Sequence, residues 1–283
     1  MSSSSAVPGQ PLRVERGSGI AWVTFDFPPM NLLGGDLIGA LLGLVAELEH
    51  DAATRVVVFR SADPDFFIAH GDVETIVGVP VAPVPEAREL NFVHQLFERV
   101  RRLPQVTIAQ VEGFARGGGS EFALACDMRF AARGKAVFGQ PEIALGILPG
   151  AGGTARLARL VGRARASEII LGGEDFSADE AERYGWINRA LPPEALPGFV
   201  ARLARRIASF PALTLQEAKR AIQGVSDATT EGDLLIEQRA FDRLMHDPRA
   251  ERVPRMQRFL DRGVQTRLGE RALAPACESL DRD

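Results

Sequence analysis

The sequence contains few residues suited to covalent cross-links or metal binding. Its 283 residues include two cysteines, Cys126 and Cys277, and neither belongs to a C-x-x-C motif or a disulfide framework. We therefore expect a reducing compartment, the cytoplasm. The four histidines show no metal-ligand spacing, so we predict no metal site. The first ten residues lack both a basic start and an apolar run, which predicts neither a signal peptide nor a membrane segment.

An excess of positive charge is also absent. The chain has 33 Lys and Arg against 37 Asp and Glu, a formal net charge of −4, which gives no reason to expect nucleic-acid binding. Hydrophobic residues make up 46% and charged residues 25%, as in an ordinary globular protein. A chain of this length can bury a large core, either as one domain or as a domain with an appendage.

The spacing of apolar residues predicts strands alternating with helices, and then helices alone. Strands are expected at residues 20–26, 56–60, 106–112, 128–132 and 136–138, and helices at residues 35–50, 91–103 and 120–126. Later helices are expected at residues 154–161, 163–171, 178–184, 196–209, 212–224, 230–246 and 249–262. Loops are expected at residues 61–73 and at the proline-containing residues 78–85. This order indicates a layered α/β core followed by a helical appendage.

Three consecutive glycines, residues 117–119, follow a predicted strand and precede a predicted helix. Glycine lets the backbone approach a ligand closely, and the free N–H groups at a helix start favour negative charge. The turn therefore suits an oxyanion or a phosphate, although a purely structural tight turn explains it equally well. No Gly-Lys-Ser/Thr follows it, and its spacing is not that of a dinucleotide fingerprint.

Two glutamates lie close to glycine-rich turns. Glu121 falls in the first turn of the predicted apolar helix, and Glu142 follows Pro141 in a glycine-rich loop. Either one alone is explained by a favourable helix terminus or a solvated loop charge. Two carboxylates beside one backbone anion site suit acid–base chemistry better, because one can take a proton while the other delivers one.

Three segments match the motifs of a known superfamily. Residues 67–72 resemble a Phe-x-Ala-Gly-x-Asp loop, and residues 113–121 form a complete Gly-x-x-x-Gly-Gly-Gly-x-Glu turn. Residues 139–153 contain Gly-x-Pro-Glu followed by Leu-Gly-x-x-Pro-Gly-x-Gly-Gly. By the order and spacing of these motifs, the chain resembles the enoyl-CoA hydratase/isomerase, or crotonase, superfamily across residues 12–262.

The resemblance implies an α/β fold, namely a crotonase-like spiral of βα (ββα) turns with a C-terminal helical region. The expected parts are a disordered tail at residues 1–10, the spiral core at 11–195, a helical oligomerisation region at 196–262 and a loose tail at 263–283. The implied assembly is a homo-trimer, or a homo-hexamer made of two trimers.

The resemblance also implies an enzyme that adds water to a 2-enoyl-CoA thioester through an enolate. The backbone N–H groups of Gly71 and Gly118 would hold the enolate oxygen. Glu121 would act on the water and Glu142 on the proton at the α-carbon. Coenzyme A is part of the substrate, and no metal or redox cofactor is implied. Further substrate contacts are expected from Ala69, His70, Asp72, Gly117, Pro141 and Gly150.

Other functions are also compatible with these residues. The carboxylate pair could serve double-bond isomerisation, and the same fold supports other acyl-CoA reactions such as thioester hydrolysis. A catalytically weak scaffold that binds acyl-CoA or RNA is a third hypothesis. The intact carboxylate pair and the acidic net charge both disfavour it.

Three residues depart from the pattern or have open roles. His70 stands where the superfamily usually has glycine, and we interpret it as tolerated loop variation rather than a catalytic histidine. Arg116, beside the glycines, is expected at the surface, with a CoA phosphate as the alternative partner. Lys219 is expected to be an exposed helix charge, with the nucleotide end of CoA as the alternative. The sequence leaves acyl-chain length and stereochemistry open.

Overall fold

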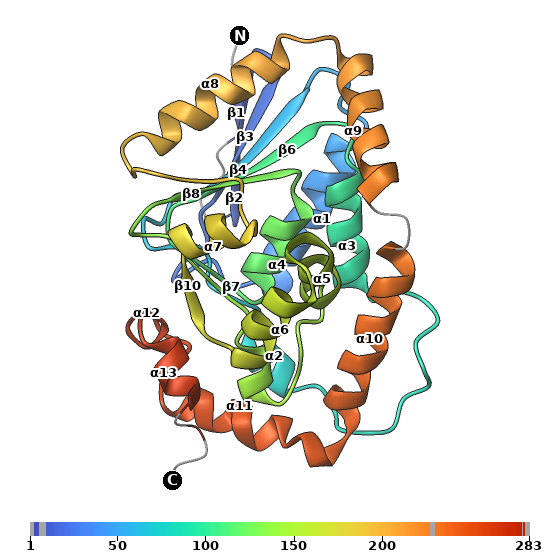
Figure 1. The fold of residues 1–283 in the computed structure, drawn as a ribbon, viewed down its shortest axis with the longest axis vertical. Helices are drawn as coiled ribbons and strands as arrows, with labels where there is room; N and C mark the ends of the chain where they lie inside the picture. The colour runs from blue at the N-terminus through green and yellow to red at the C-terminus, as the bar shows by residue number, and fades with distance from the viewer. Residues whose placement is uncertain (1–2, 6–9, 227–229, 279, 281–283) are drawn as a thin grey trace.

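A seven-stranded sheet forms the centre of the molecule (Figure 1). The computed structural model describes residues 3–5, 10–226, 230–278 and 280. The strand order is β1-β2-β3-β4-β6-β8-β11. These strands are β1 (Ser3–Ser5), β2 (Leu12–Gly17), β3 (Ile20–Phe25), β4 (Val56–Ser61), β6 (Val106–Val111), β8 (Met128–Ala132) and β11 (Arg189–Leu191). Strands β1 to β3 pair antiparallel, and all pairs from β3 to β11 are parallel.

A second, four-stranded sheet has the order β10-β9-β7-β5. Its strands are β5 (Phe66–Ile68), β7 (Phe114–Arg116), β9 (Val137–Gly139) and β10 (Asp175–Ser177). After each of β4, β6 and β8 the chain passes within a few residues into β5, β7 and β9, and these short strands are again parallel. The chain therefore repeats one step three times, which is the α/β spiral that the resemblance implies.

Helices cover the sheets and then form the C-terminal region. The helices of the core are α1 (Gly35–Leu48), α2 (Val73–Val77), α3 (Phe92–Arg102), α4 (Gly118–Ala125), η1 (Glu142–Leu145), α5 (Gly153–Val161), α6 (Arg163–Gly172) and α7 (Ala178–Tyr184). They are followed by α8 (Leu196–Ala208), α9 (Ala212–Ser226), α10 (Thr230–His246), η2 (Pro248–Ala250), α11 (Arg252–Asp261), α12 (Arg267–Glu270) and α13 (Leu273–Glu278). In Figure 1, α8 lies near the N-terminus, while α10 to α13 run along the opposite end of the molecule.

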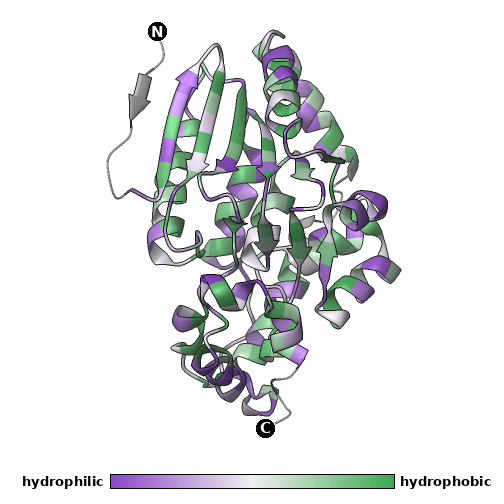
Figure 2. Ribbon diagram, turned by 90° about the vertical axis from the view of Figure 1, so that its left-hand side faces the viewer, coloured by the Kyte–Doolittle hydropathy of each residue, from purple (hydrophilic) through white to green (hydrophobic). Residues whose placement is uncertain are grey.

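Strand β4 shows why the central sheet is buried on both faces. Val57 and Phe59 point into the larger apolar core, which also contains Phe25 and Phe122. Val56 and Val58 point to the other face and pack with α8. Alternate side chains of a strand face opposite sides, so a continuous apolar run fits only a sheet covered twice. Figure 2 shows the inner strands coloured mainly as hydrophobic.

The N-terminal expectation differs from the structure at one segment. Residues 1–10 were expected to be a disordered tail, but Ser3–Ser5 form β1, which pairs with β2. Without β1, strand β2 would be the edge of the sheet and would leave a row of N–H and C=O groups unpaired. Residues 1–2 and 6–9 lie outside the described part of the chain.

The expectation of a loose tail at residues 263–283 does not hold for the described part of that segment. Helices α12 and α13 dock against α11, because Leu273, Cys277 and Leu280 are buried in one apolar cluster with Met256 and Phe259. Most residues of this segment are polar, so its sequence did not indicate that a few apolar side chains pack it against the rest of the protein. The tail therefore belongs to the folded body and reaches the glycine-rich turns.

Close backbone contact between α4 and β5 positions the predicted site. A Cβ on Gly119 would lie 2.0 Å from the carbonyl oxygen of Ile68, a distance that no side chain tolerates. Glycine at this position therefore lets the first turn of α4 sit directly on the end of β5. This packing brings the loop after β5 next to the N-terminus of α4.

Candidate active site

The structure brings the two predicted oxyanion glycines together. Gly71 lies three residues after β5, and Gly118 is the first residue of α4. A Cβ on Gly118 would lie 3.4 Å from the Gly71 nitrogen and 2.8 Å from Leu33 Cδ2. The two backbones therefore approach within the distance that one small acceptor could bridge.

The N–H groups of both glycines are left over by the backbone hydrogen bonds described around them. Leu33 donates to the His70 carbonyl at 2.9 Å and accepts from the Asp72 N–H at 3.2 Å. In this parallel bridge the N–H of the central residue, Gly71, points to the opposite side. Gly118 lies in the first helical turn, where N–H groups have no intrahelical acceptor. A backbone pair of this kind can stabilise negative charge.

Glu121 extends from the first turn of α4 into a buried polar site. Its side chain is 3% exposed, and its Oε1 accepts from the N–H groups of Ala151 at 2.7 Å and Gly153 at 2.8 Å. Burial and the nearby charge of Glu237 raise the pKa of Glu121 to about 7. The two N–H donors act in the opposite direction, because they stabilise the ionised form.

Glu142 begins η1 and faces the glycine turn. It is 8% exposed, and a Cβ on Gly117 would lie 2.9 Å from its Oε1. The side-chain nitrogen of Gln140, oriented to satisfy both atoms of its amide, donates to Oε1 at 2.9 Å and Oε2 at 3.1 Å. Burial, followed by the charge of Glu121, raises the pKa of Glu142 well above its ordinary value.

The two carboxyl groups form an electrostatically coupled pair. The negative charge of Glu121 disfavours ionisation of Glu142 and so raises the pKa of Glu142. Glu121 receives two backbone N–H bonds, whereas Glu142 depends on an amide side chain. The ionised form of Glu121 is therefore the better stabilised of the two, and Glu142 is the more suited to carry a proton. Such a pair supplies both a base and an acid.

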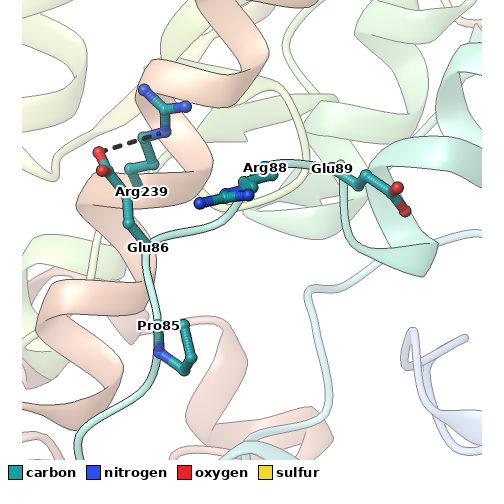
Figure 3. A pocket seen from close by; sticks show the side chains of 5 residues that line it. All are labelled: Pro85, Glu86, Arg88, Glu89 and Arg239. Carbon is teal, nitrogen blue, oxygen red and sulfur yellow. Dashed lines mark ion pairs between the residues drawn. The ribbon is translucent and has the colours of Figure 1, made fainter.

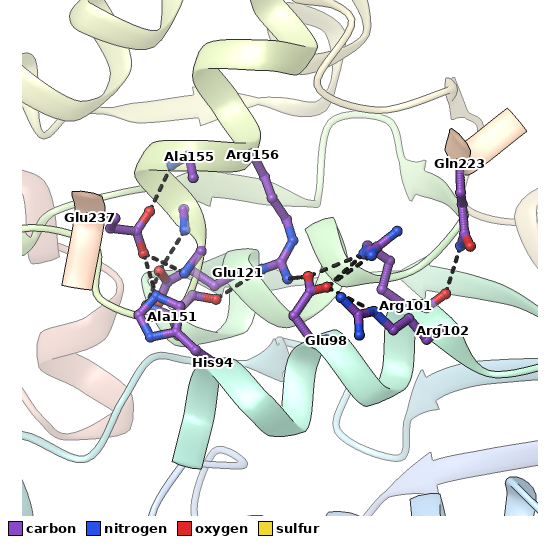
Figure 4. Close-up of polar contacts among 12 residues, drawn as sticks. His94, Glu98, Arg101, Arg102, Glu121, Ala151, Ala155, Arg156, Gln223 and Glu237 are labelled. Atoms are coloured by element: carbon purple, nitrogen blue, oxygen red, sulfur yellow. Dashed lines mark hydrogen bonds and ion pairs between the residues drawn. The ribbon is translucent and has the colours of Figure 1, made fainter. Parts of the chain in front are cut away.

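A buried ion network fixes the loop that binds Glu121 (Figure 4). Glu237, on α10, accepts from Gly152 N–H at 2.6 Å, Ala155 N–H at 2.7 Å and His94 Nε2 at 2.9 Å. Arg156 holds the Ala151 carbonyl at 2.9 Å. Glu121 and Glu237 thus share the N-terminus of α5, where N–H groups and the helix dipole stabilise negative charge.

The other residues predicted to contact substrate differ in how close they lie to the two carboxyl groups. Gly117 adopts φ 46°, which favours glycine, and lies between Glu142 and His70. Ala69 is buried, and its backbone bonds to Met30 and Arg116. The remaining three lie as follows: Asp72 caps α2, Pro141 precedes η1, and Gly150 packs against the ring of Phe241 on α10. The structure therefore brings Gly117 and His70 to the carboxylates, while Asp72 is engaged as a helix cap.

Two expectations about basic residues were wrong. Arg116 is fully buried and pairs with Asp175 at 2.6 Å and Glu270 at 3.0 Å, so it is neither at the surface nor open to a phosphate. Lys219 is also buried, and its Nζ lies 2.7 Å from Asp127 and 2.8 Å from the Gln105 carbonyl. Both charges are inside because long-range packing supplies partners that desolvated ions require.

Four important residues of the site escaped the sequence interpretation, namely His94, Gln140, Glu237 and Glu270. His94 lies three residues before Phe97 on the same helix, so helical spacing could have predicted that it faces the core. The same spacing applies to Glu237, which lies three residues after the buried Leu234 on α10, but no such signal exists for Glu270. Their partners lie more than 80 residues away along the chain.

A surface hollow of about 500 Å³ lies between the loop before α3 and α10 (Figure 3). Its lining residues are Pro85, Glu86, Arg88, Glu89 and Arg239. Arg239 pairs with Glu86 at 3.4 Å and is two residues from Glu237. Neither Glu121 nor Glu142 lines this hollow, so its polar wall is separate from the acid pair.

Comparison with known proteins places the chain among enoyl-CoA hydratases and isomerases. The sequence model of the family described as enoyl-CoA hydratase/isomerase matches residues 15–265. A short-chain-enoyl-CoA hydratase of Clostridium acetobutylicum is 34% identical over 230 residues, covering 81% of this chain and 87% of that protein. A crotonyl-CoA hydratase of Syntrophomonas wolfei is 35% identical over 213 residues, covering 75% of this chain and 80% of that protein.

Solved structures give the same result. A crystal structure described as a candidate enoyl-CoA hydratase from Streptomyces avermitilis matches with a TM-score of 0.86 and 39% identity, covering 96% of this chain and 99% of that one. An enoyl-CoA hydratase of Bacillus anthracis matches with a TM-score of 0.70 and 30% identity, covering 89% and 97% of the two chains. The chain belongs to the enoyl-CoA hydratase/isomerase family.

Metal-type side-chain clusters and membrane-spanning helices are both absent from the described residues. Within them, no cluster of three or more His, Cys, Asp or Glu side chains has the arrangement of a metal site. Among the helices of the described ranges, none combines the length and the apolar character needed to cross a membrane.

Proposed function

We propose that this protein is an enoyl-CoA hydratase, which adds water across the double bond of a 2-enoyl-CoA thioester. One observation carries the proposal. Two buried carboxyl groups with raised pKa values, Glu121 and Glu142, lie beside paired backbone N–H groups of Gly71 and Gly118. Hydration needs a base for water, an acid for carbon and a site for a negative oxygen, and this arrangement offers all three.

In the proposed reaction, the thioester oxygen accepts hydrogen bonds from Gly71 and Gly118. Glu121, ionised, removes a proton from water as the water oxygen bonds to the β-carbon. The electrons of the double bond move toward the thioester and produce an enolate, whose negative oxygen the two N–H groups stabilise. Loss of one such donor typically costs about a hundredfold or more in rate.

Proton delivery completes the addition. Glu142 gives its proton to the α-carbon, and the enolate collapses to the saturated 3-hydroxyacyl thioester. Glu121 then holds the proton taken from water while Glu142 is ionised, so one proton exchange restores the starting pair. The net change is addition of one water: its hydroxyl group bonds to the β-carbon, the α-carbon receives the proton of Glu142, and the proton left on Glu121 replaces it in the pair. No metal ion or redox cofactor takes part in the proposed chemistry.

The test is turnover of crotonyl-CoA, followed by loss of the ultraviolet absorbance of its conjugated double bond. The wild-type protein should remove this absorbance and form 3-hydroxybutyryl-CoA. No turnover of short or long 2-enoyl-CoA would reject the proposal. Conversion of a 3-enoyl-CoA to the 2-enoyl isomer without hydration would instead identify an isomerase, which uses the same enolate.

We further propose a homo-trimer, or a homo-hexamer, as the assembly. Helix α9 exposes the apolar side chains Leu213, Ile222 and Val225, which an interface would cover. Light scattering on the purified protein should give three or six times the chain mass of 30.6 kDa. A monomer at micromolar concentration would contradict this proposal.

We also propose a cytoplasmic location and no nucleic-acid partner. Both cysteines are free thiols, as expected in a reducing compartment, and the net charge is −4. Cell fractionation that recovers the protein in an organelle or a membrane pellet would contradict the location. Retention of RNA at physiological salt would contradict the second statement.

A further inference from the structure

His70 connects the predicted oxyanion loop to the C-terminal segment. Its Nδ1 lies 2.6 Å from the carbonyl oxygen of Gly71, and its Nε2 lies 2.5 Å from Oε1 of Glu270. The ring is buried and packs edge-on against Phe259 of α11, with 6.1 Å between ring centroids. A side chain from α12, 200 residues later in the sequence, therefore holds the residue beside Gly71.

Both ring nitrogens of His70 face hydrogen-bond acceptors. A carbonyl oxygen cannot donate, and a neutral imidazole has only one N–H group. The second oxygen of Glu270 accepts from Arg116 Nη1 at 3.0 Å, so this carboxylate is surrounded by donors. With Glu270 as a carboxylate, the geometry satisfies both contacts of His70 only when both of its nitrogens carry a proton, as in the imidazolium ion.

The surrounding charges favour this state. Burial alone would lower the pKa of His70, but the charge and hydrogen bond of Glu270 and the Gly71 carbonyl together raise it above its ordinary value. Arg116, on β7, opposes this rise. Arg116 is itself neutralised by Asp175, to which it makes two bonds of 2.6 and 2.7 Å.

Two further titratable groups approach this cluster. Burial raises the pKa of Cys277, on α13, to about 12, so its thiol carries no charge at neutral pH. Glu142 approaches from η1, because its Oε1 and the Cβ of His70 both border Gly117. The buried residues His70, Arg116 and Glu270 thus form, with the partly exposed Asp175, a group of two positive and two negative charges.

Hydrogen bonds restrain the peptides on both sides of Gly71, whose N–H is the proposed oxyanion donor: Leu33 binds the peptide that carries this N–H, and the His70 ring binds the next one. The Gly71 N–H belongs to the peptide that joins residue 70 to residue 71, and its direction depends on the torsions on both sides. Leu33 fixes the backbone from one side, and the His70 ring fixes the Gly71 carbonyl from the other. Glycine itself resists rotation poorly, so an external restraint has a large effect at this position.

We propose that His70, held as an imidazolium by Glu270, is a positioning residue that restrains Gly71 through its carbonyl group and places a positive charge beside the oxyanion site. The kinetic part of this inference rests on the proposed hydratase function. It assigns a role to the C-terminal segment, because α12 supplies the carboxylate. It also explains why a bulky residue is accommodated where glycine is usual in the superfamily.

The protonation state is tested first, without any assay of activity. Nitrogen NMR spectra of the protein labelled with ¹⁵N-histidine should show both nitrogens of one histidine protonated at pH 7.5. Replacement His70→Gln assigns that signal, which should disappear. A neutral tautomer of His70 in the folded wild-type protein would overturn the proposal.

The positioning role is tested by Glu270→Gln, which keeps the shape of the side chain and removes its charge. We expect kcat for crotonyl-CoA to fall by about tenfold, less than the loss of an oxyanion donor itself, with KM changed by less than about threefold. The alkaline limb of the kcat profile should move to lower pH, because His70 then loses its proton more easily. Leu268→Ala, on the same helix and 82% exposed, is the matched control and should behave as wild type.

The outcomes separate the two hypotheses. A wild-type protein that hydrates no enoyl-CoA refutes the proposed function, whatever the state of His70. An active wild type with a folded Glu270→Gln variant of equal kcat and unchanged pH profile refutes only the positioning role. Equal losses in Glu270→Gln and Leu268→Ala would show a general effect of disturbing α12 and would also refute it.

Discussion

Replacement of Glu121 by glutamine should abolish activity and yet stabilise the protein at alkaline pH. Glu121 is 3% exposed and carries a charge above its pKa of about 7, compared with an ordinary value of 4.5. Glutamine has nearly the same shape and keeps an oxygen that can accept from Ala151 and Gly153. The substitution therefore removes the cost of burying a charge while it keeps the two hydrogen bonds.

The magnitude follows from the linkage between protonation and folding. Below pH 4.5 the carboxyl group is protonated in both the folded and unfolded states, so ionisation costs the fold nothing. As the pH rises from 4.5 through about 7, the unfolded state ionises first and the folded state loses stability. A difference of this size corresponds to about 3 kcal/mol once both states are ionised. Because Glu142 and Glu237 share the cost, we expect about 1–3 kcal/mol for Glu121→Gln at pH 8.

The assay is urea unfolding of wild type and variant at pH 5 and pH 8. The two tryptophans, Trp22 and Trp186, provide the fluorescence signal. The variant should have a higher free energy of unfolding at pH 8, and the gain should shrink at pH 5. Glu89→Gln, at an exposed position, is the control and should change neither value by more than about 0.5 kcal/mol. A variant less stable than wild type at pH 8, or a gain independent of pH, would refute the reasoning.

Three further predictions follow from the packing and the ion network. Glu237→Gln should lower the pKa of Glu121 and move the acidic limb of kcat/KM to lower pH by about one pH unit; an unmoved limb would show that Glu237 does not act on the base. Gly119→Ala should lower the free energy of unfolding, measured by thermal unfolding, by at least about 2 kcal/mol. Gly43→Ala, in an open helix position, should raise it by about 0.5–1 kcal/mol. Equal effects of the two substitutions would contradict the close contact between Gly119 and Ile68. Arg116→Lys should cost about 2–4 kcal/mol in urea unfolding, because lysine cannot make the paired bonds to a buried carboxylate; a neutral result would show that the pair is unimportant.

Local patterns in the sequence predict much of this fold. Residues 56–59 are all apolar and the segment 56–60 was predicted as a strand; β4 has Val57 and Phe59 on one face and Val56 and Val58 on the other. Proline at position 104 and the spacing before it predicted a helix that the structure places at Phe92–Arg102. Such elements depend on residues that are close in sequence, so the spacing of their apolar residues predicts them without the tertiary structure.

The second sheet was not predicted in full because its strands have only three residues. A segment such as Phe66–Ile68 is too short to show alternation, and pairing with Phe114–Arg116 is what makes it a strand. The loop expected at residues 61–73 therefore contains β5. Non-local pairing, rather than propensity, determines such elements.

In the candidate site, too, the residues in local motifs could be predicted and those with distant partners could not. The glycines and glutamates stand in recognisable motifs within residues 67–153, so their approach in space could be expected from the resemblance. Arg116 and Lys219 were misjudged because their partners are far along the chain, and the contact of His70 with Glu270 could not be foreseen for the same reason. Glu270 lies 200 residues from His70, and Asp127 lies on a different element from Lys219. A buried charge is stabilised by groups that only the folded chain brings together.

The most direct test of the account is a crystal structure with an unreactive acyl-CoA bound. The thioester oxygen should lie about 3 Å from the backbone nitrogens of both Gly71 and Gly118. The carboxyl groups of Glu121 and Glu142 should then face the α- and β-carbons. A thioester bound elsewhere, or either carboxyl group turned away from those carbons, would contradict the proposed mechanism.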